Sequence, residues 1–256
     1  MHRFHLAPND WLSAELTGSE ARHAGSVLRL GVGDRIVLFD GRGREATAEI
    51  RALELGAVRL RILQETITPP LRAHITLAQA IPKGKNMDLI VQKAVEIGAA
   101  EIYPLLSART VVQLDPEGAA QKQAKWQTVA LEAAKQCGQN WLPQIHRPRS
   151  PNDFFALHAA AARSRADYDL RLIGSLQPGA RHLKKILTDY AEAHDGARPA
   201  RVLMLIGPEG DFTPAEIGLA RSQGCLPLTL GPIILRVETA AIYCLSILSY
   251  ELLGEG

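Results

Sequence analysis

The sequence predicts an α/β protein in which a small β module precedes a larger, mostly parallel sheet with helices on both faces. Up to about residue 72 the chain reads as short strands and turns, whereas from His74 onward apolar strands alternate with helical segments. With 256 residues, 46% of them hydrophobic and 22% charged, the chain can bury a sizeable core. We therefore expect two domains, residues 1–72 and 73–256, separated near Pro69-Pro70, which blocks helix and central-strand hydrogen bonding.

The first region has the pattern of a small β-barrel. Residues 34–50 read as a hairpin with Asp40-Gly41 as its turn, and residues 57–63 alternate apolar and basic side chains as a half-buried strand does. One short helix is expected at residues 19–28. The region carries ten Arg, no Lys and nine acidic residues. An arginine-only basic set suits phosphate contacts and stacking on bases, although solvated strand faces explain it equally well.

The second region alternates between apolar strands and segments with helical spacing of apolar residues. Apolar residues recur at helical spacing over residues 86–97, and Gly98 is a suitable helix stop. Thr213-Pro214-Ala215-Glu216 is a capping box with Pro at the first helical position, so another helix begins there. Strands are expected at residues 74–81, 101–105, 170–173, 202–206 and 225–230, and further helices at residues 119–137, 153–163, 180–193 and from about 237 to the end.

Two short apolar runs near the C-terminus stop at Gly-Pro and are followed by helical segments. The first contains Ile206-Gly207-Pro208 and the second Leu230-Gly231-Pro232. Paired strand–loop–helix units of this kind build a ligand crevice at the carboxyl ends of parallel strands. Glycine lets the backbone turn sharply and approach a ligand closely. We therefore predict a ligand site between these two loops.

The two loops are poorly suited to phosphate. They lack the dinucleotide fingerprint and the P-loop pattern, each Pro removes a backbone N–H donor, and Glu209 would repel an anion. An apolar slot edged by backbone amides, carbonyls and carboxylates suits a flat heterocycle on a group that is not anionic overall. S-adenosylmethionine (SAM) fits this description, as one candidate among adenosine-like ligands.

Composition excludes several other classes. No apolar run is long enough for a membrane span, and the N-terminus lacks the apolar core of a signal peptide, so we expect a cytoplasmic protein. The three cysteines and eight histidines are scattered without metal-ligand spacing, so no metal is expected. A net charge of +2 does not by itself indicate a nucleic-acid partner.

Several stretches together resemble one family of RNA methyltransferases. "IGPEGDFTPAEI" and "LGPIILRVETAAI" resemble the two C-terminal motifs of the SPOUT class, and "RHAGSVLRLGVGD", "PKGKNMDLIVQKAVEIG", "ARTVV" and "KWQTVALEAAKQCG" resemble the RsmE family within it. That family methylates N3 of a uridine in 16S ribosomal RNA (rRNA) of the small ribosomal subunit, uridine 1498 in the usual rRNA numbering. The resemblance implies SAM as cofactor, a PUA-like β-barrel before a SPOUT domain with a C-terminal trefoil knot, and a homodimer with active sites at the subunit interface.

The resemblance also assigns residues to the cofactor site. The expected cofactor-binding residues are Ile206, Gly207, Pro208, Glu209, Gly210, Leu230, Gly231, Ile234, Leu235 and Thr239. The chain departs from the family pattern at Ile233, Ala108, Gln139 and Asp211, where the family commonly has Arg, Glu, Arg and Gly. We expect the cofactor fold to tolerate these changes, and the lost arginines to alter RNA contacts.

Arg236 and Glu238 are the expected catalytic residues. Uridine N3 carries a proton that must leave before or during attack on the methyl group, and charge then develops on the flanking carbonyl oxygens. Arg236 would stabilise that charge, and Glu238 would orient Arg236 or relay the proton. A structural reading, in which Arg236 starts a helix or lies at the dimer interface and pairs with Glu238, stays open.

RNA contacts are expected from basic side chains of both domains, because the target base must be unpaired or splayed out while its backbone is held. Solvation of surface loops explains the same side chains without RNA. The expected RNA-binding residues are Arg3, Arg22, His23, Arg29, Lys83 and Lys85.

Two alternatives remain at this stage. The same enzyme class could act on another RNA base, or the chain could be a non-catalytic RNA-binding assembly factor. Binding of SAM without methyl transfer would distinguish the second alternative. A nucleotide-hydrolysing enzyme is disfavoured because no phosphate-cradling motif is present.

Overall fold

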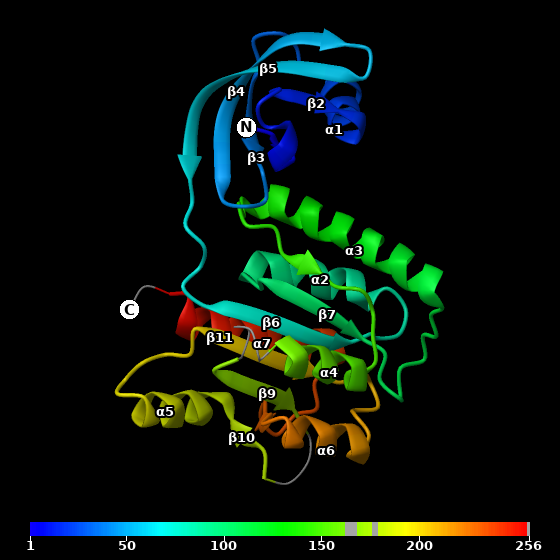
Figure 1. Cartoon of the computed structure of the whole chain (residues 1–256), viewed down its shortest axis with the longest axis vertical. Helices are drawn as coiled ribbons and strands as arrows, with labels where there is room; N and C mark the ends of the chain where they lie inside the picture. Colours follow the sequence, from blue (N-terminus) through cyan, green and yellow to red (C-terminus); the bar gives the residue numbers. More distant parts are fainter. Residues whose placement is uncertain (162–167, 176–178, 255–256) are drawn as a thin grey trace. The chain divides into compact units, whose positions relative to one another are not determined.

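A computed structural model describes residues 1–161, 168–175 and 179–254 of the chain (Figure 1). The chain forms two compact units: Met1–Pro70 with Leu131–Leu142, and Leu71–Ala130 with Pro143–Gly256. Residues 131–142 were predicted to belong to the second domain, because the predicted boundary lay near Pro69-Pro70. The long helix α3 (Pro116–Cys137) therefore begins in one unit and ends in the other.

The first unit contains a curled mixed sheet in the order β1–β3–β4–β5–β2. The two longest strands pair antiparallel with register shifts at Thr47/Ala48 and Ile50/Ala52, and such bulges bend a sheet. The predicted hairpin is confirmed by the pairing of β3 with β4. The strands are β1 (Arg3–His5), β2 (Glu15–Thr17), β3 (Arg35–Phe39), β4 (Arg44–Glu54) and β5 (Ala57–Ile67).

The short helix predicted at residues 19–28 is present but changes its winding. It begins as α1 (Gly18–Arg22) and continues as a π-helical turn, η2 (His23–Val27). A second short segment, the 3-10 helix η1 (Pro8–Asp10), precedes β2. Spacing of apolar residues did not predict the wider turn, because one π-turn shifts the periodicity by a single residue.

The segment 131–142 is fastened to the first unit by polar contacts. Lys135 Nζ donates to Glu20 Oε1 at 2.5 Å, and the Trp141 indole donates to the Thr68 carbonyl at 2.9 Å. Gly43 lies so close that a Cβ atom there would be 2.6 Å from the Thr68 carbonyl oxygen and 2.8 Å from the Trp141 ring. These contacts explain why the end of α3 belongs to this unit although the sequence pattern continues from the other.

The second unit contains a seven-stranded sheet in the order β10–β12–β9–β11–β6–β7–β8, and every neighbouring pair is parallel. This confirms the predicted mostly parallel sheet. The two-residue edge strands β8 and β10 were not predicted, because two residues carry no periodicity. The strands are β6 (His74–Ala80), β7 (Glu101–Leu105), β8 (Gln144–Ile145), β9 (Leu170–Gly174), β10 (Arg181–His182), β11 (Arg201–Ile206) and β12 (Leu226–Thr229).

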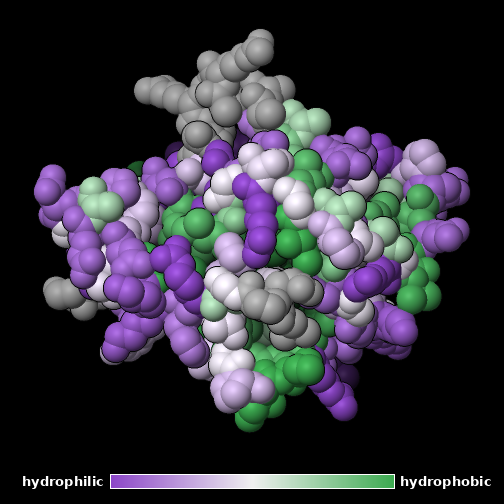
Figure 2. Space-filling view, turned by 90° about the horizontal axis from the view of Figure 1, so that it is seen from below, coloured by the Kyte–Doolittle hydropathy of each residue, from purple (hydrophilic) through white to green (hydrophobic). Residues whose placement is uncertain are grey.

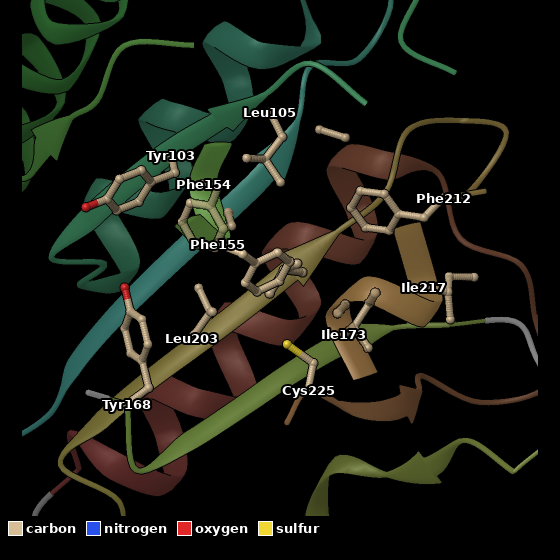
Figure 3. Packing of buried hydrophobic residues seen from close by; sticks show 14 residues of the cluster. Tyr103, Leu105, Phe154, Phe155, Tyr168, Ile173, Leu203, Phe212, Ile217 and Cys225 are labelled. Atoms are coloured by element: carbon tan, nitrogen blue, oxygen red, sulfur yellow. The ribbon is translucent and has the colours of Figure 1, made fainter. Parts of the chain in front are cut away.

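Helices cover both faces of this sheet. α2 packs against α7, which contacts β6 and β11 on one face. On the opposite face Phe154 and Phe155 of α4 and Ile217 of α6 pack on Leu203 and its neighbours (Figure 3). The bounds of these helices and of α5 are α2 (Asn86–Ile97), α4 (Pro151–Ala161), α5 (Leu183–Ala193), α6 (Pro214–Ser222) and α7 (Val237–Leu252).

Several predicted element ends are confirmed in detail. α2 and β7 have the predicted bounds, and Gly98 ends α2 in the left-handed conformation with φ +97°. Thr213 and Glu216 form the predicted capping box at the start of α6. The predicted end of the helix over 153–163 lies outside the described residues, and α5 starts three residues later than predicted because Arg181 and His182 form β10. The trefoil knot stays a prediction.

The described part of the chain contains no helix that is long and apolar enough to cross a membrane. All three cysteines are free, and burial raises the pKa of Cys225 and of Cys244 to about 12, so these two thiols stay protonated.

Candidate active site

The two glycine–proline loops meet at one cavity of about 470 Å³ in the second unit. The first loop follows β11 and the second follows β12, and both leave the carboxyl edge of the parallel sheet. β9 lies between these strands, and its last residue, Gly174, and the following Ser175 also line the cavity. A cavity of this size accommodates a small organic ligand.

Most of the sequence-predicted cofactor residues line this cavity. Gly210 and Thr239 do not line it, whereas Arg236 and Glu238 do. Among the positions that depart from the family pattern, Asp211 and Ile233 line it as well. The predicted cofactor residues that line it are Ile206, Gly207, Pro208, Glu209, Leu230, Gly231, Ile234 and Leu235.

The first loop is held by its own turn and by an apolar anchor. Phe212 is buried in the cluster under α4 and α6, where Figure 3 shows its ring. Asp211 adopts the left-handed conformation with φ +61°, and its Oδ1 accepts the Phe212 N–H at 2.8 Å. A Cβ atom on Gly207 would lie 3.2 Å from Asp211 Oδ1 and from the Phe212 nitrogen, which explains the glycine there.

A neighbouring loop supports the first loop from outside. Arg109 donates to the Gly210 carbonyl. Glu216 uses one carboxylate oxygen for the capping box at Thr213, and its other oxygen accepts the Ala108 N–H at 2.8 Å. The segment after β7 is therefore fixed to the first loop at Gly210 and to α6 at Glu216. This arrangement does not need the acidic side chain that the family commonly has at position 108.

The second loop turns at Gly231 and then becomes exposed. Gly231 has φ +115°, a conformation that favours glycine, and its N–H donates to Thr229 Oγ1 at 3.3 Å. Ile233 and Ile234 are 74% and 76% exposed. Arg236 is the N-cap residue of α7, and its exposed side chain makes no capping hydrogen bond.

A third segment, which joins β6 to the start of α2, contacts the first loop and the first turn of α7. The Lys83 N–H donates to Glu209 Oε1 at 2.9 Å, and Asn86 Nδ2 donates to Glu238 Oε2 at 3.2 Å. Among the described residues no ion pair joins Glu238 to Arg236. Asn86 also lines the cavity, although the sequence analysis did not assign it to the site. The signal that could have indicated it is topological, since Asn86 follows the carboxyl end of a strand adjacent to β11.

The chemistry of the lining agrees with the argument against phosphate. The charged side chains in the lining are Glu209, Asp211, Arg236 and Glu238, so carboxylates outnumber cations. The rest is glycine, proline, aliphatic side chains and small polar groups. Such a lining suits a flat, uncharged ring system joined to a cationic group.

The predicted RNA-binding residues differ in their availability. Arg22, Arg29, Lys83 and Lys85 are exposed and His23 is half-buried. The Arg3 guanidinium instead donates to Glu45 at 2.6 Å and to the Asn140 side chain at 2.5 Å, and it lies over the Phe39 ring with its side chain 14% exposed. Arg3 thus stabilises the first unit, and a role of Arg3 in RNA binding stays a prediction.

No cluster of His, Cys, Asp and Glu side chains in the described ranges is arranged to hold a metal ion.

Comparison with known proteins gives two family matches. Residues 69–249 match the model of an RNA methyltransferase domain, and residues 16–63 match that of an RNA methyltransferase PUA domain. Ribosomal RNA small subunit methyltransferase E of Bacillus subtilis is 30% identical over 239 residues, which is 92% of this chain and 89% of that protein.

Solved structures resemble the whole chain. A methyltransferase of Legionella pneumophila in complex with SAM is 33% identical with a TM-score of 0.84. Ribosomal RNA small subunit methyltransferase E of Neisseria gonorrhoeae, bound to SAM, is 31% identical with a TM-score of 0.80. Each comparison covers 98% of both chains.

Proposed function

Because the chain belongs to the ribosomal RNA small subunit methyltransferase E family, we propose that it methylates N3 of one uridine in 16S rRNA with SAM as methyl donor. The proposed target is uridine 1498 in the usual rRNA numbering. The protein then works in the cytoplasm on RNA of the small ribosomal subunit.

One observation carries the cofactor part of this proposal: both glycine–proline loops line the same cavity. Its apolar walls and small residues suit adenine and ribose, and the carboxylates of Glu209 and Asp211 suit a ligand that carries positive charge. Bound SAM would supply a methyl group activated by its sulfonium. Related methyltransferases with SAM bound, at TM-scores of 0.84 and 0.80, support SAM as the ligand.

Arg236 is the proposed electrostatic catalyst. When uridine N3 loses its proton, negative charge spreads to the two flanking carbonyl oxygens. Arg236 is exposed at the cavity and makes no capping bond, so its guanidinium is free to meet a carbonyl oxygen of an incoming base. A permanent cation held there lowers the energy of the transition state more than that of the neutral base.

Glu238 is the proposed proton acceptor. It lines the cavity two residues after Arg236, and only one of its carboxylate oxygens is bonded to Asn86. In the proposed step the N3–H bond breaks and the proton passes to Glu238. The N3 electron pair forms the bond to the methyl carbon, and the electron pair of the broken carbon–sulfur bond remains on sulfur.

RNA binding is proposed to use both units. Lys83 and Lys85 flank Gly84, and the Lys83 N–H donates to Glu209 of the first loop, so phosphate contacts there would lie beside the cavity. Arg22, His23 and Arg29 of the first unit supply further sequence-independent contacts.

A homodimer is proposed because apolar side chains remain exposed on α7 and on the second cofactor loop. Tyr243 and Tyr250 are 47% and 82% exposed and lie seven residues apart, which places them on one face of α7. Ile233 and Ile234 add apolar surface next to the cavity. One face of the molecule in space-filling view shows hydrophobic surface between hydrophilic side chains (Figure 2). A second copy that covered these side chains would bring its chain close to the active site.

The proposal is tested with purified protein, SAM and small ribosomal subunits that lack the modification. After the reaction the RNA is digested, and its nucleosides are separated and identified by mass spectrometry. We expect N3-methyluridine at one site. A different methylated base would contradict the target assignment and keep the enzyme class, whereas SAM binding without any transfer would favour a non-catalytic assembly factor.

A further inference from the structure

Asn86 makes a contact that helix capping does not explain. It is the first residue of α2, one position after the N-cap residue Lys85, so the capping preference of asparagine does not apply to it. α2 has no side-chain cap, and the Asn86 amide instead donates to Glu238, 152 residues away in the sequence. The side chain is half-buried and lines the cavity.

The surroundings hold Asn86 in place. The segment before it is fastened to the first cofactor loop by the Lys83 N–H bond to Glu209, and α2 packs along α7, which carries Glu238 in its first turn. The Asn86 amide and the Glu238 carboxylate thus each lie in the first turn of a helix, and both residues line the cavity.

We propose that Asn86 is a positioning residue that orients the Glu238 carboxylate toward the target base. Its amide holds Oε2, so Oε1 is the oxygen that accepts the N3 proton. This inference rests on the proposed function, because it assigns a task within that same reaction.

A neutral amide is suited to this task. A glutamate side chain has three rotatable bonds, and only a few of its rotamers would bring an oxygen to a base in the cavity. A lysine or arginine at position 86 would also hold the carboxylate, but its positive charge would stabilise the ionised form and make it a weaker base. Asn86 restricts the rotamer without adding a charge to a site whose charged lining groups are Glu209, Asp211, Arg236 and Glu238.

The test compares Asn86→Ala, Asn86→Asp, Glu238→Gln and the double variant Asn86→Ala with Glu238→Gln. The matched control is Asn152→Asp, because Asn152 is an exposed asparagine in the first turn of α4 and does not line the cavity. Thermal unfolding of each variant shows that it is folded. The readouts are kcat, KM for the ribosomal substrate and the Kd of SAM.

We expect Asn86→Ala to lower kcat about tenfold with KM and the SAM Kd nearly unchanged. Asn86→Asp lowers kcat further, on the order of a hundredfold, because it places a second carboxylate against Glu238. In the Glu238→Gln background, Asn86→Ala causes no additional loss, because the group that it positions has lost its function. Asn152→Asp retains wild-type kcat.

Three results would overturn the inference: unchanged kcat in Asn86→Ala, a multiplicative loss in the double variant, or a weaker SAM Kd in place of a lower kcat. The identity of the wild-type product tests the proposed function separately from these ratios. A wild-type protein that transfers no methyl group would overturn both.

Discussion

The seven-stranded sheet has an amino edge, where its parallel strands begin, and a carboxyl edge, where they end. Polar side chains are paired with one another at the amino edge and line a cavity at the carboxyl edge. At the amino edge, Glu101 at the start of β7 is joined to His74 Nε2 at 3.0 Å and to His146 Nε2 at 2.9 Å, so one carboxylate ties together three chain segments. At the carboxyl edge the loops after β11 and β12 leave a cavity lined by charged and apolar side chains.

The amino edge around Glu101 is hydrogen-bonded and packed. Tyr103 stacks on His146 with ring centroids 3.7 Å apart, and His158 is bonded to Tyr168. Burial alone would raise the pKa of the Glu101 carboxyl, but the hydrogen bonds from His146 and His74 outweigh burial and hold that pKa well below its usual range. Glu101 is therefore ionised and paired at all ordinary pH values.

The carboxyl edge contains the features that a stable core avoids. Asp211 and Gly231 have positive φ angles, and Ile233, Ile234 and Arg236 face solvent. The buried polar cluster and the cavity thus lie at opposite edges of one sheet and on different strands: the cluster on β6 and β7, the cavity at the ends of β9, β11 and β12. Substitutions at one edge should therefore change either stability or ligand chemistry and leave the other intact.

The largest effect is expected for Arg236→Ala. Loss of the guanidinium should reduce methyl transfer about 10²–10³-fold, because the charge on the base carbonyl is no longer compensated. The unfolding temperature and the SAM Kd should stay at wild-type values. The control is Arg221→Ala, which removes an exposed arginine of α6. Wild-type turnover in Arg236→Ala would remove this residue from the mechanism.

Glu101→Ala should show the opposite pattern. It removes two hydrogen bonds to a charged, largely buried group, so the free energy of unfolding should fall by about 2–4 kcal/mol in a urea titration. SAM affinity, measured by calorimetry, should not change. Glu192→Ala, at an exposed position of α5, serves as the control. A large loss of SAM affinity in Glu101→Ala would show that the two edges are coupled.

The pH dependence of that stability difference has a defined sign. Because the pKa of Glu101 is lowered in the folded state, its contribution is fully present above the ordinary carboxyl value of 4.5 and is lost as the pH falls below it. The gap between wild type and Glu101→Ala should therefore still be present at about pH 5. It should narrow in more acidic urea titrations, and a gap that widened there would contradict the assignment.

Gly231→Ala should have a moderate effect on the cofactor loop. The backbone at φ +115° is strained for alanine, although no atom lies within 4 Å of the added Cβ, so the loop should shift and the SAM Kd rise about tenfold. Gly56→Ala is the matched control, since Gly56 has φ +82° and equally open space in the first unit. Equal SAM affinities in these two variants would argue against a cofactor role for the second loop.

Asp211→Gly should have the smallest effect. Glycine relieves the positive φ angle but loses the hydrogen bond from the Phe212 N–H to the aspartate side chain. These contributions oppose each other, so the free energy of unfolding should change by less than about 1 kcal/mol. A larger loss in a urea titration would mean that the side-chain bond dominates and that Asp211 is required in this chain.

Much of the fold was predictable because local signals agreed with tertiary structure. The pattern of α2, its glycine stop and the capping box at Thr213 are each encoded within a few residues, and the structure places all three as predicted. The association of residues 131–142 with the first unit was not predictable. It depends on contacts such as that of Lys135 with Glu20, which lie 115 residues apart in the sequence.

Fewer residues of the site than of the fold could be predicted from the sequence. Gly-Pro at the ends of two apolar strands indicated the loops, since that signal is local. Neither Asn86 nor Gly174 has a local signal, and strand order alone brings them to the cavity. Arg3 shows the converse limit, because nothing in the sequence indicated that its guanidinium would be held by Glu45 and Asn140.

The most direct measurement of the central claim is photolabelling with SAM that carries tritium in its methyl group, followed by tryptic mapping. Trypsin cleaves after Arg201, Arg221 and Arg236, so the loop at Gly207 and the loop at Gly231 fall in separate peptides. We predict label in the peptides 202–221 or 222–236, and its loss when unlabelled SAM is present in excess. Label confined to any other peptide would contradict the claim that these two loops hold the cofactor.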